Sequence, residues 1–141
     1  MDKADIIARI SLFSMMKRRD LRRIAKNARH YVYQKGDIII REGERDGRVF
    51  VLIAGKVEVI IAMGTAREKR IRTFGPDSYF GEMAVLDDYI RTASVVACEE
   101  TEVLSLDHWN IREEIRKYPA IAIELIQTLS RRLREAYGEI F

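Results

Sequence analysis

The chain has 141 residues, of which 48% are hydrophobic and 33% are charged. Its 25 basic and 22 acidic side chains leave a formal net charge of +3, so the overall charge does not point to a nucleic-acid partner. This length fits one domain with a proper core, and the balanced composition excludes a disordered or low-complexity chain. The single cysteine, Cys98, excludes an intramolecular disulfide and fits a reducing compartment.

The amino terminus carries no targeting pattern. The first residues, MDKAD, lack the basic-then-apolar order of a signal peptide. The longest apolar stretch, residues 49–63, is interrupted by Lys56 and Glu58, so it does not have the character of a membrane span. We therefore expect a cytoplasmic protein with no membrane partner.

Helical periodicity marks the first part of the chain, up to residue 29, in two groups of apolar residues separated by Ser-Leu-Phe-Ser. Residues 30–107 then carry short β-branched and aromatic runs bounded by turn clusters such as Asp46-Gly47 and Gly75-Pro76-Asp77. The predicted strands are 31–34, 38–41, 49–53, 57–62, 70–74, 92–98 and 102–106. Short strands at regular spacing favour a sandwich, roll or barrel.

Helical periodicity returns after Asp107, which is expected to cap a helix that ends at the Pro119 break. In the last helix, apolar residues alternate spacings of four and three, as in a coiled-coil seam. The seam residues are Ala122, Ile126, Leu129, Leu133, Ala136 and Ile140. This stripe predicts either packing on the β-structure or self-association, and both remain open.

We find no internal repeat and no linker that would mark a second domain. The sequence therefore predicts an α+β fold in one domain over residues 1–141. Its parts are a helical entry at 1–29, an antiparallel β-roll at 30–107 and C-terminal helices at 108–141.

Residues 79–97, YFGEMAVLDDYIRTASVVA, combine features that a plain strand does not need. Gly81 and Glu82 precede an apolar run that fits one helical turn, whose first N–H groups lack internal partners and attract an anion. Arg91 could complete an anion site with two parallel hydrogen bonds, while the Glu82 carboxylate suits a hydroxyl such as a ribose 2′-OH. The combination indicates a nucleotide, although an acid and an arginine at this spacing more often form a surface ion pair.

The stretch FGEMAVLDDYIRTASVVA resembles the phosphate-binding cassette of cyclic nucleotide-binding domains. This family is shared by catabolite-activator-type regulators, cyclic-nucleotide-dependent kinases and gated channels. The resemblance covers nearly the whole chain: SLFSMM is similar to the family's entry turn, YQKGDIIIREGERDGRVFVLIAGKVEVI to its first four strands, and TEVLSLD to its last strand. It implies a jelly-roll-like β-roll flanked by helices, with the cassette at residues 80–95.

The resemblance implies roles for individual cassette residues. Glu82 matches the acid that binds the ribose 2′-OH, and Arg91 matches the arginine that holds the cyclic phosphate. The backbone N–H of Ala84 and the hydroxyl of Thr92 match further phosphate or base contacts. Gly81 stands where the cassette needs its turn. The chain departs from the family's pattern at Ile90, where proline is frequent, so we expect a less rigid loop.

Apolar positions complete the implied pocket. Met83 and Val95 match lining positions, with Ile71 and Phe74 as less direct neighbours, and core packing is the alternative for each. In the family the last helix supplies a lid over the base, and Tyr137 lies in the matching region together with Leu133, Arg134 and Ala136. A surface or seam role is the alternative for these residues.

The function implied by the resemblance is that of a cyclic nucleotide sensor, not an enzyme, with cyclic AMP expected over cyclic GMP and no metal. Thr92 is compatible with either purine. We expect ligand contacts to tighten the cassette and bring the C-terminal helix over the purine, because a ligand shifts only states that it binds differently. Expected partners are an effector protein and a second copy of the chain. Because the chain ends at Phe141, we expect no DNA-binding domain in it.

Two other functions remain open. A degenerate domain of the same fold could act as a protein-interaction module. A cupin-like metal enzyme would need clustered ligands, but His30 and His108 are the only histidines and lie at opposite ends of the β-region. Both are predicted to be surface or packing residues, Trp109 is predicted to pack at a helix start, and Cys98 is predicted to be a buried, unreactive thiol.

Overall fold

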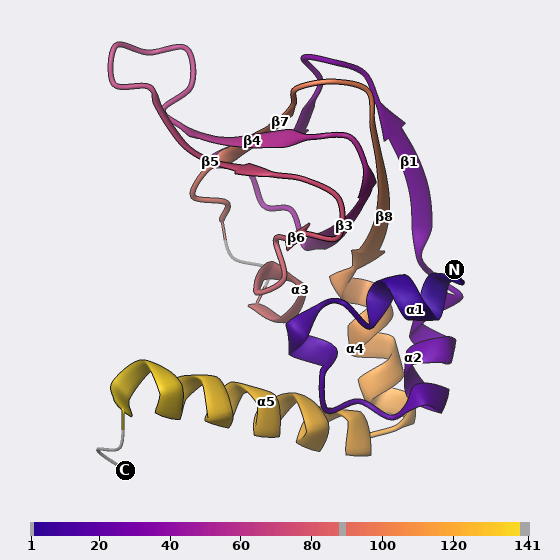
Figure 1. The fold of residues 1–141 in the computed structure, drawn as a ribbon. Helices are drawn as coiled ribbons and strands as arrows, with labels where there is room; N and C mark the ends of the chain where they lie inside the picture. Colours follow the sequence, from indigo (N-terminus) through magenta and orange to yellow (C-terminus); the bar gives the residue numbers. More distant parts are fainter. Residues whose placement is uncertain (1, 88–89, 139–141) are drawn as a thin grey trace.

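A computed structural model describes residues 2–87 and 90–138. A β-roll of two sheets lies above a layer of helices, and the last helix extends from that layer under the roll (Figure 1). Three residues named in the predicted cassette and seam, Asp88, Tyr89 and Ile140, lie outside the described residues.

The entry segment is helical, as its periodicity predicts. It forms α1 (Lys3–Ile7), the 3₁₀-helix η1 (Ser11–Phe13) and α2 (Arg18–Ala25). Asp2 caps α1, since its Oδ1 accepts a hydrogen bond of 2.9 Å from the backbone N–H of Asp5. The Ser-Leu-Phe-Ser separator is therefore a short helix of its own, and Leu12 and Phe13 within it are buried.

Both sheets have four antiparallel strands, which confirms the predicted fold class. The first sheet has the order β1 (Arg29–Tyr33), β8 (Thr101–Asp107), β3 (Arg48–Ala54) and β6 (Tyr79–Phe80). The second has the order β2 (Ile38–Ile40), β7 (Ser94–Ala97), β4 (Val57–Ile61) and β5 (Lys69–Phe74). The two-residue strand β6 was not predicted, because its pattern is too short to show alternation.

Strand β3 separates two hydrophobic cores. Successive side chains of a strand point to opposite faces, so Val49 and Val51 pack towards the helices while Phe50 and Leu52 face the second sheet. Between the sheets, the rings of Phe50 and Phe80 stack with centroids 5.1 Å apart. The roll and the helical layer therefore share one sheet as a common wall.

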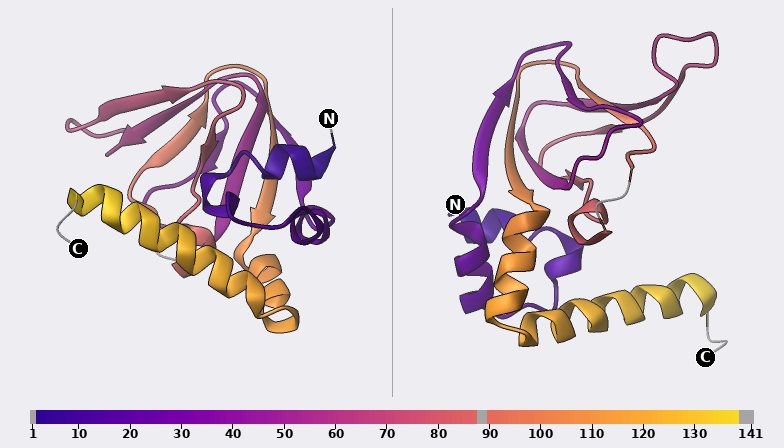
Figure 2. Two further views of the ribbon diagram at one scale, coloured as in Figure 1. Left: turned by 60° about the horizontal axis from the view of Figure 1, so that its bottom comes forward. Right: turned by 180° about the vertical axis from the view of Figure 1, so that it is seen from behind.

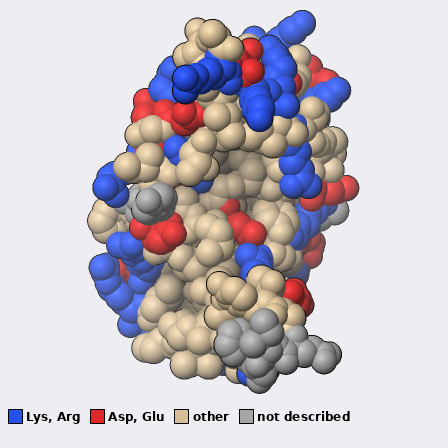
Figure 3. Space-filling model, turned by 90° about the vertical axis from the view of Figure 1, so that its left-hand side faces the viewer, with Lys and Arg blue, Asp and Glu red and all other residues tan. Residues whose placement is uncertain are grey.

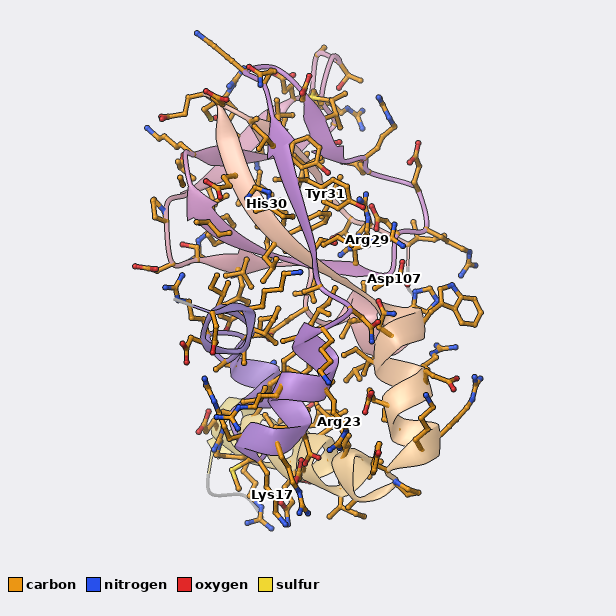
Figure 4. All side chains as sticks on the ribbon, turned by 90° about the vertical axis from the view of Figure 1, so that its right-hand side faces the viewer. Lys17, Arg23, Arg29, His30, Tyr31 and Asp107 are labelled. Atoms are coloured by element: carbon orange, nitrogen blue, oxygen red, sulfur yellow. The ribbon has the colours of Figure 1, made fainter. Side chains whose placement is uncertain are left out.

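The remaining helices are α3 (Ala84–Asp87), α4 (His108–Lys117) and α5 (Ala120–Tyr137). Asp107 caps α4 as expected, since its Oδ1 accepts a hydrogen bond of 3.0 Å from the N–H of Trp109. Arg23 of α2, labelled in Figure 4, donates a hydrogen bond of 3.2 Å to the Glu114 carboxylate of α4. Its guanidinium carbon also lies 3.7 Å from the ring centroid of Tyr118. These contacts join the two helices next to the start of α5.

Helix α5 runs beneath the rest of the molecule in Figure 1, and it crosses in front when the bottom is turned forward (Figure 2, left). It contacts η1 and α4, and it buries Ile121, Leu125 and Thr128. The seam residues Ile126 and Leu133 are exposed instead, so the interpretation that the seam packs on the β-roll is wrong for them. The buried stripe lies one position before the predicted seam, and the seam residue Leu129 is partly buried against the core next to the helices.

Within the described ranges, none of the helices combines the length and apolar character needed to cross a membrane.

Candidate functional site

The predicted cassette lines a cavity of about 360 Å³. A neighbouring cavity of about 280 Å³ shares Gly81, Arg91 and Thr92 with it and extends over β4, β5 and β7. Figure 3 views this side of the molecule, where largely uncharged surface surrounds a hollow that contains acidic and basic atoms. The structure thus brings together, along the two cavities, the predicted residues Gly81, Glu82, Met83, Ala84, Arg91, Thr92, Val95 and Ile71.

Gly81 has a backbone conformation that other residues rarely adopt. Its φ angle is +81°, in the left-handed region. A Cβ atom at this position would lie 2.7 Å from Nη1 of Arg91 and 2.8 Å from the carbonyl oxygen of Arg48. The glycine therefore provides both the turn into α3 and the space that the Arg91 guanidinium occupies.

Arg91 is a buried cation at the junction of the two cavities, with only 9% of its surface exposed. Its guanidinium donates to the carbonyl oxygens of Gly81, at 3.4 Å, and Arg48. Its Nε is buried and has no hydrogen-bond partner among the described residues. Burial lowers the pKa of the Arg91 guanidinium, and the carboxylate of Asp46, 3.7 Å from Nη2, opposes that effect. Arginine stays protonated in proteins, so this arrangement suits an anionic ligand.

Asp46 is a charged neighbour of the site that the sequence analysis treated only as a turn residue. Its carboxylate accepts two hydrogen bonds of 2.8 Å from Arg48, in a bidentate pair. Burial opposes ionisation of Asp46, but the hydrogen bonds of Arg48 and the charges of Arg48 and Arg91 outweigh it and lower the pKa of the carboxyl. The Asp-Gly-Arg order at 46–48 was the available signal, because one carboxylate two residues before an arginine can form such a pair.

Glu82 is held by a residue that sequence reasoning missed. Arg132 of α5 donates to Oε1 and Oε2 of Glu82, each at 3.1 Å. Nη2 of Arg132 also donates to Oγ of Ser11, which accepts a second hydrogen bond of 2.8 Å from the hydroxyl of Tyr79. The cassette acid, α5, η1 and β6 therefore meet at one polar cluster.

The apolar lining residues differ in burial. Val95 belongs to the core between the sheets, and Phe74 packs against that core, so the core-packing alternative fits both as well as a lining role. Met83 and Ile71 are exposed large hydrophobic residues along the cavities, so the core-packing alternative is wrong for them. Thr92 is exposed and lines both cavities. Tyr137 is exposed and lines neither cavity.

The residues considered for other chemistry lie elsewhere. His30 is bonded to Glu102 on the outside of the first sheet, and His108 is buried against Gly47, as the packing prediction requires. Trp109 is exposed, so the prediction that it packs is wrong. Cys98 is half-buried rather than buried. Across the part of the chain that the structure describes, no three His, Cys, Asp or Glu residues are placed to hold a metal ion.

A third cavity, of about 250 Å³, lies on the side shown in Figure 4, where Arg29, Tyr31 and Asp107 are labelled. It contains none of the predicted site residues.

A family model described as a cyclic nucleotide-binding domain matches residues 31–118, which is more than half of the chain. The chain belongs to the cyclic nucleotide-binding domain family. It is thus a cyclic nucleotide-binding regulatory domain, as the cassette resemblance implied. The family is regulatory and not catalytic.

Among curated relatives, a CRP-like cAMP-activated global transcriptional regulator of Mycobacterium tuberculosis is 29% identical over 136 residues, covering 96% of this chain and 61% of that protein. A cGMP-dependent protein kinase of Toxoplasma gondii is 35% identical over 121 residues, covering 86% of this chain and 12% of the kinase. The chain therefore spans less than two thirds of the length of these relatives.

A solved structure with a similar fold is the N-terminal domain of a transcriptional regulator from Streptomyces coelicolor. Its TM-score is 0.83 at 27% sequence identity, and the match covers 94% of each chain. The likeness extends over nearly the full length of both chains.

Proposed function

We propose that the chain is a cytoplasmic cyclic nucleotide sensor, a binding module rather than an enzyme, that prefers cyclic AMP and couples binding to movement of its C-terminal helix. One observation carries the proposal: the buried guanidinium of Arg91 lies beside the cassette cavity, and its Nε donor has no hydrogen-bond partner among the residues that the structure describes. A buried cation with a free donor is costly unless an anion completes it. The cyclic phosphate is such an anion.

In this proposal each cassette residue has one task. Arg91 and the N–H of Ala84 donate hydrogen bonds to the cyclic phosphate, and the Glu82 carboxylate accepts a hydrogen bond from the ribose 2′-hydroxyl. Thr92 contacts the phosphate or the base from the rim shared by the two cavities. The purine lies against the apolar side chains of Met83, Val95 and Ile71. Two adjoining cavities of about 360 and 280 Å³ fall in the size range of small-molecule sites.

The proposed purine preference rests on the relatives and not on Thr92. A hydroxyl at this position is compatible with either base. The M. tuberculosis relative, described as cAMP-activated, matches 96% of this chain, while the kinase relative described as cGMP-dependent matches 86%. The longer match supports cyclic AMP.

The coupling proposal is supported by the contact between α5 and the cassette. Because Arg132 of α5 is bonded to Glu82, any ligand that engages Glu82 acts on the helix as well. Tyr137 becomes a lid over the base only after α5 moves, since it now lines neither cavity. An effector protein would read the position of this helix.

Self-association is proposed through the outward face of α5. This face presents Ile126, Leu133 and Tyr137, which are large and exposed. Exposed apolar residues in a row on one helix fit a second copy of the same helix. Sedimentation velocity should show a dimer for the wild-type chain and a monomer for Leu133→Glu, and a wild-type monomer at high concentration would contradict this part of the proposal.

The test is isothermal titration of the nucleotide-stripped protein with cyclic AMP and cyclic GMP. Arg91→Ala should weaken binding by about 10²- to 10³-fold, or about 3 to 4 kcal/mol, because two charge-assisted hydrogen bonds are lost. Arg70→Ala is the matched control, since Arg70 is an exposed arginine of β5 that pairs with Glu58 at 2.6 Å. It should change affinity less than about twofold.

A loss below fivefold in Arg91→Ala would contradict the phosphate assignment. Tighter binding of cyclic GMP than of cyclic AMP would reverse the proposed preference. If the wild-type chain produced no heat with either nucleotide, the protein-interaction module would become the leading account.

A further inference from the structure

The Arg132–Glu82 pair is stronger than an ordinary surface ion pair. The side chains of Glu82 and Arg132 are only 18% and 27% exposed, respectively. Two parallel hydrogen bonds of 3.1 Å occupy both carboxylate oxygens at once. Charge-assisted bidentate pairs hold a fixed geometry, and partial burial protects this one from screening by salt. Glu82 is therefore already committed to a cation from the chain itself.

The guanidinium of Arg132 is fixed from its other side as well. Nη2 donates to Oγ of Ser11 in η1, and the Tyr79 hydroxyl donates to the same Oγ at 2.8 Å. Arg132 is thus bound between the cassette and the entry segment. To leave Glu82, Arg132 must either give up its contact with Ser11 through a change of side-chain conformation or be carried away by movement of this part of α5.

In the position of α5 at which Arg132 contacts Glu82, the helix does not form a closed lid. While the pair is formed, Tyr137 is 55% exposed and outside both cavities. Tyr137 and Arg132 belong to one continuous helix. Because α5 carries both residues, a movement of that helix that brings Tyr137 against a cavity also displaces the backbone that carries Arg132.

We infer that Arg132 is an affinity-determining residue that competes with the ribose 2′-hydroxyl of the nucleotide for the Glu82 carboxylate, and this inference rests on the proposed function. The nucleotide binds only the fraction of molecules in which Glu82 has left Arg132, which lowers the apparent affinity by that fraction. By linkage, bound nucleotide frees α5 to the same extent that the pair opposes binding. The Arg132–Glu82 pair therefore couples nucleotide binding to the release of α5.

The deciding experiment titrates wild type, Arg132→Met and Arg131→Met with cyclic AMP and with 2′-deoxy cyclic AMP. Methionine keeps helix propensity and side-chain length but removes the guanidinium. Arg131 is the matched control, since it is the neighbouring residue and donates to Oγ of Ser14 at 2.9 Å rather than to the cassette. Arg132→Met should bind cyclic AMP about 5- to 30-fold more tightly than wild type. Arg131→Met should stay within about twofold of wild type.

The deoxy analogue tests whether Glu82 is the contested group. The analogue lacks the hydroxyl that donates a hydrogen bond to Glu82. Arg132→Met should therefore improve binding of the analogue less than binding of cyclic AMP. Equal gains for both nucleotides would place the competition elsewhere and overturn the inference. Unchanged or weaker binding of cyclic AMP by Arg132→Met, with tight binding by wild type, would also overturn it and leave the proposed function standing. If none of the three proteins bound either nucleotide, the proposed function and the inference would fall together.

Hydrogen exchange of residues 121–137 gives a second, independent measurement. Arg132→Met without nucleotide should exchange faster there than wild type and Arg131→Met. Cyclic AMP added to wild type should change α5 exchange more than 2′-deoxy cyclic AMP does at equal saturation. Identical exchange in Arg132→Met and wild type would show that the pair does not hold the helix, and this would overturn the inference.

Discussion

The cassette and α5 each contribute one arginine to the candidate site, but the two arginines are held in different ways. Arg91 is 9% exposed, bonded to two backbone carbonyls and close to Asp46, so the β-roll fixes it. Arg132 is on a helix that is buried near its start and exposed along its outer face. The difference separates an arginine that the β-roll fixes from an arginine carried by the helix that moves in the proposed function. Regions with few buried contacts open first, and the buried residues of the long helix α5 are limited to Ile121, Leu125 and Thr128 in its first half.

The largest expected effect comes from a substitution that breaks the rigid side of this comparison. Gly81→Ala adds a left-handed non-glycine residue and a Cβ that overlaps Arg91 and the Arg48 carbonyl. We expect a loss of about 2 to 5 kcal/mol in the free energy of unfolding, from conformational strain and overpacking together. Denaturant unfolding measures it, and cyclic AMP titration should show weaker binding as the guanidinium is displaced.

Gly36→Ala is the control for Gly81→Ala. Gly36 also has a left-handed φ, of +90°, but nothing lies within 4 Å of a Cβ placed there. It should lose only the strain of about 1 to 2 kcal/mol and keep its nucleotide affinity. Equal losses in the two variants would mean that the close approach of Arg91 to Gly81 does not matter.

A somewhat smaller loss of stability is expected from a substitution in the buried first half of α5. Leu125 is 4% exposed and belongs to the core shared with the entry helices, while Ile126 next to it is 56% exposed. Leu125→Ala should cost about 2 to 4 kcal/mol, and Ile126→Ala should stay within about 0.5 kcal/mol. Thermal or denaturant unfolding of the two variants at a concentration where the chain is monomeric checks this. A large loss in Ile126→Ala would show that the outer face of α5 is covered.

The smallest expected effect is a pH dependence of the free energy of unfolding that comes from Asp46, next to Arg91. The pKa of Asp46 is lowered in the folded chain, so the folded state binds fewer protons than the unfolded state in acid. The stability that Asp46 contributes is therefore fully present above its unfolded pKa of about 4 and is lost as pH falls through the folded value. Asp46→Asn should destabilise at pH 7, and its difference from wild type should shrink steadily below about pH 4.

Unfolding of wild type, Asp46→Asn and Glu113→Gln between pH 7 and pH 2 measures this contribution. Glu113→Gln removes one acidic charge from the exposed side of α4, 3.4 Å from Arg116, and controls for net charge. An Asp46→Asn difference that stays constant across the acid range would contradict the role of Asp46 as an ionised partner of Arg48 and Arg91.

The same contrast explains what the sequence could predict. The cassette is a local pattern, in which Gly81, Glu82 and Arg91 lie within eleven consecutive residues and line one cavity. The strands follow from β-branched and aromatic runs bounded by turn signals, as in β3, whose buried residues are divided between the two cores. These features are set by neighbours in sequence, so a single chain displays them.

Arg132 could not be predicted, because it lies 50 residues from Glu82 and stands among other basic residues of an ordinary helix face. Nothing in its own neighbourhood distinguishes it from Arg131 or Arg134. Helix α5 packs on α4 and on η1, which is distant from it in sequence, and it buries Ile121 and Leu125 rather than the predicted seam. Asp46 was missed for a different reason, since an Asp-Gly pair indicates a turn whether or not the carboxylate serves another residue.

The shared wall formed by β3 has an evolutionary consequence. Phe50 and Val51 serve opposite cores, so inserting one residue in this strand would exchange the inward and outward sets and ruin both cores at once. The loop between β4 and β5, at residues 62–68, projects away from the roll and holds no residue of the two site cavities (Figure 1). New length can accumulate at that loop without disturbing the sensor, and lineages of this domain should therefore differ in size there while β3 keeps its length.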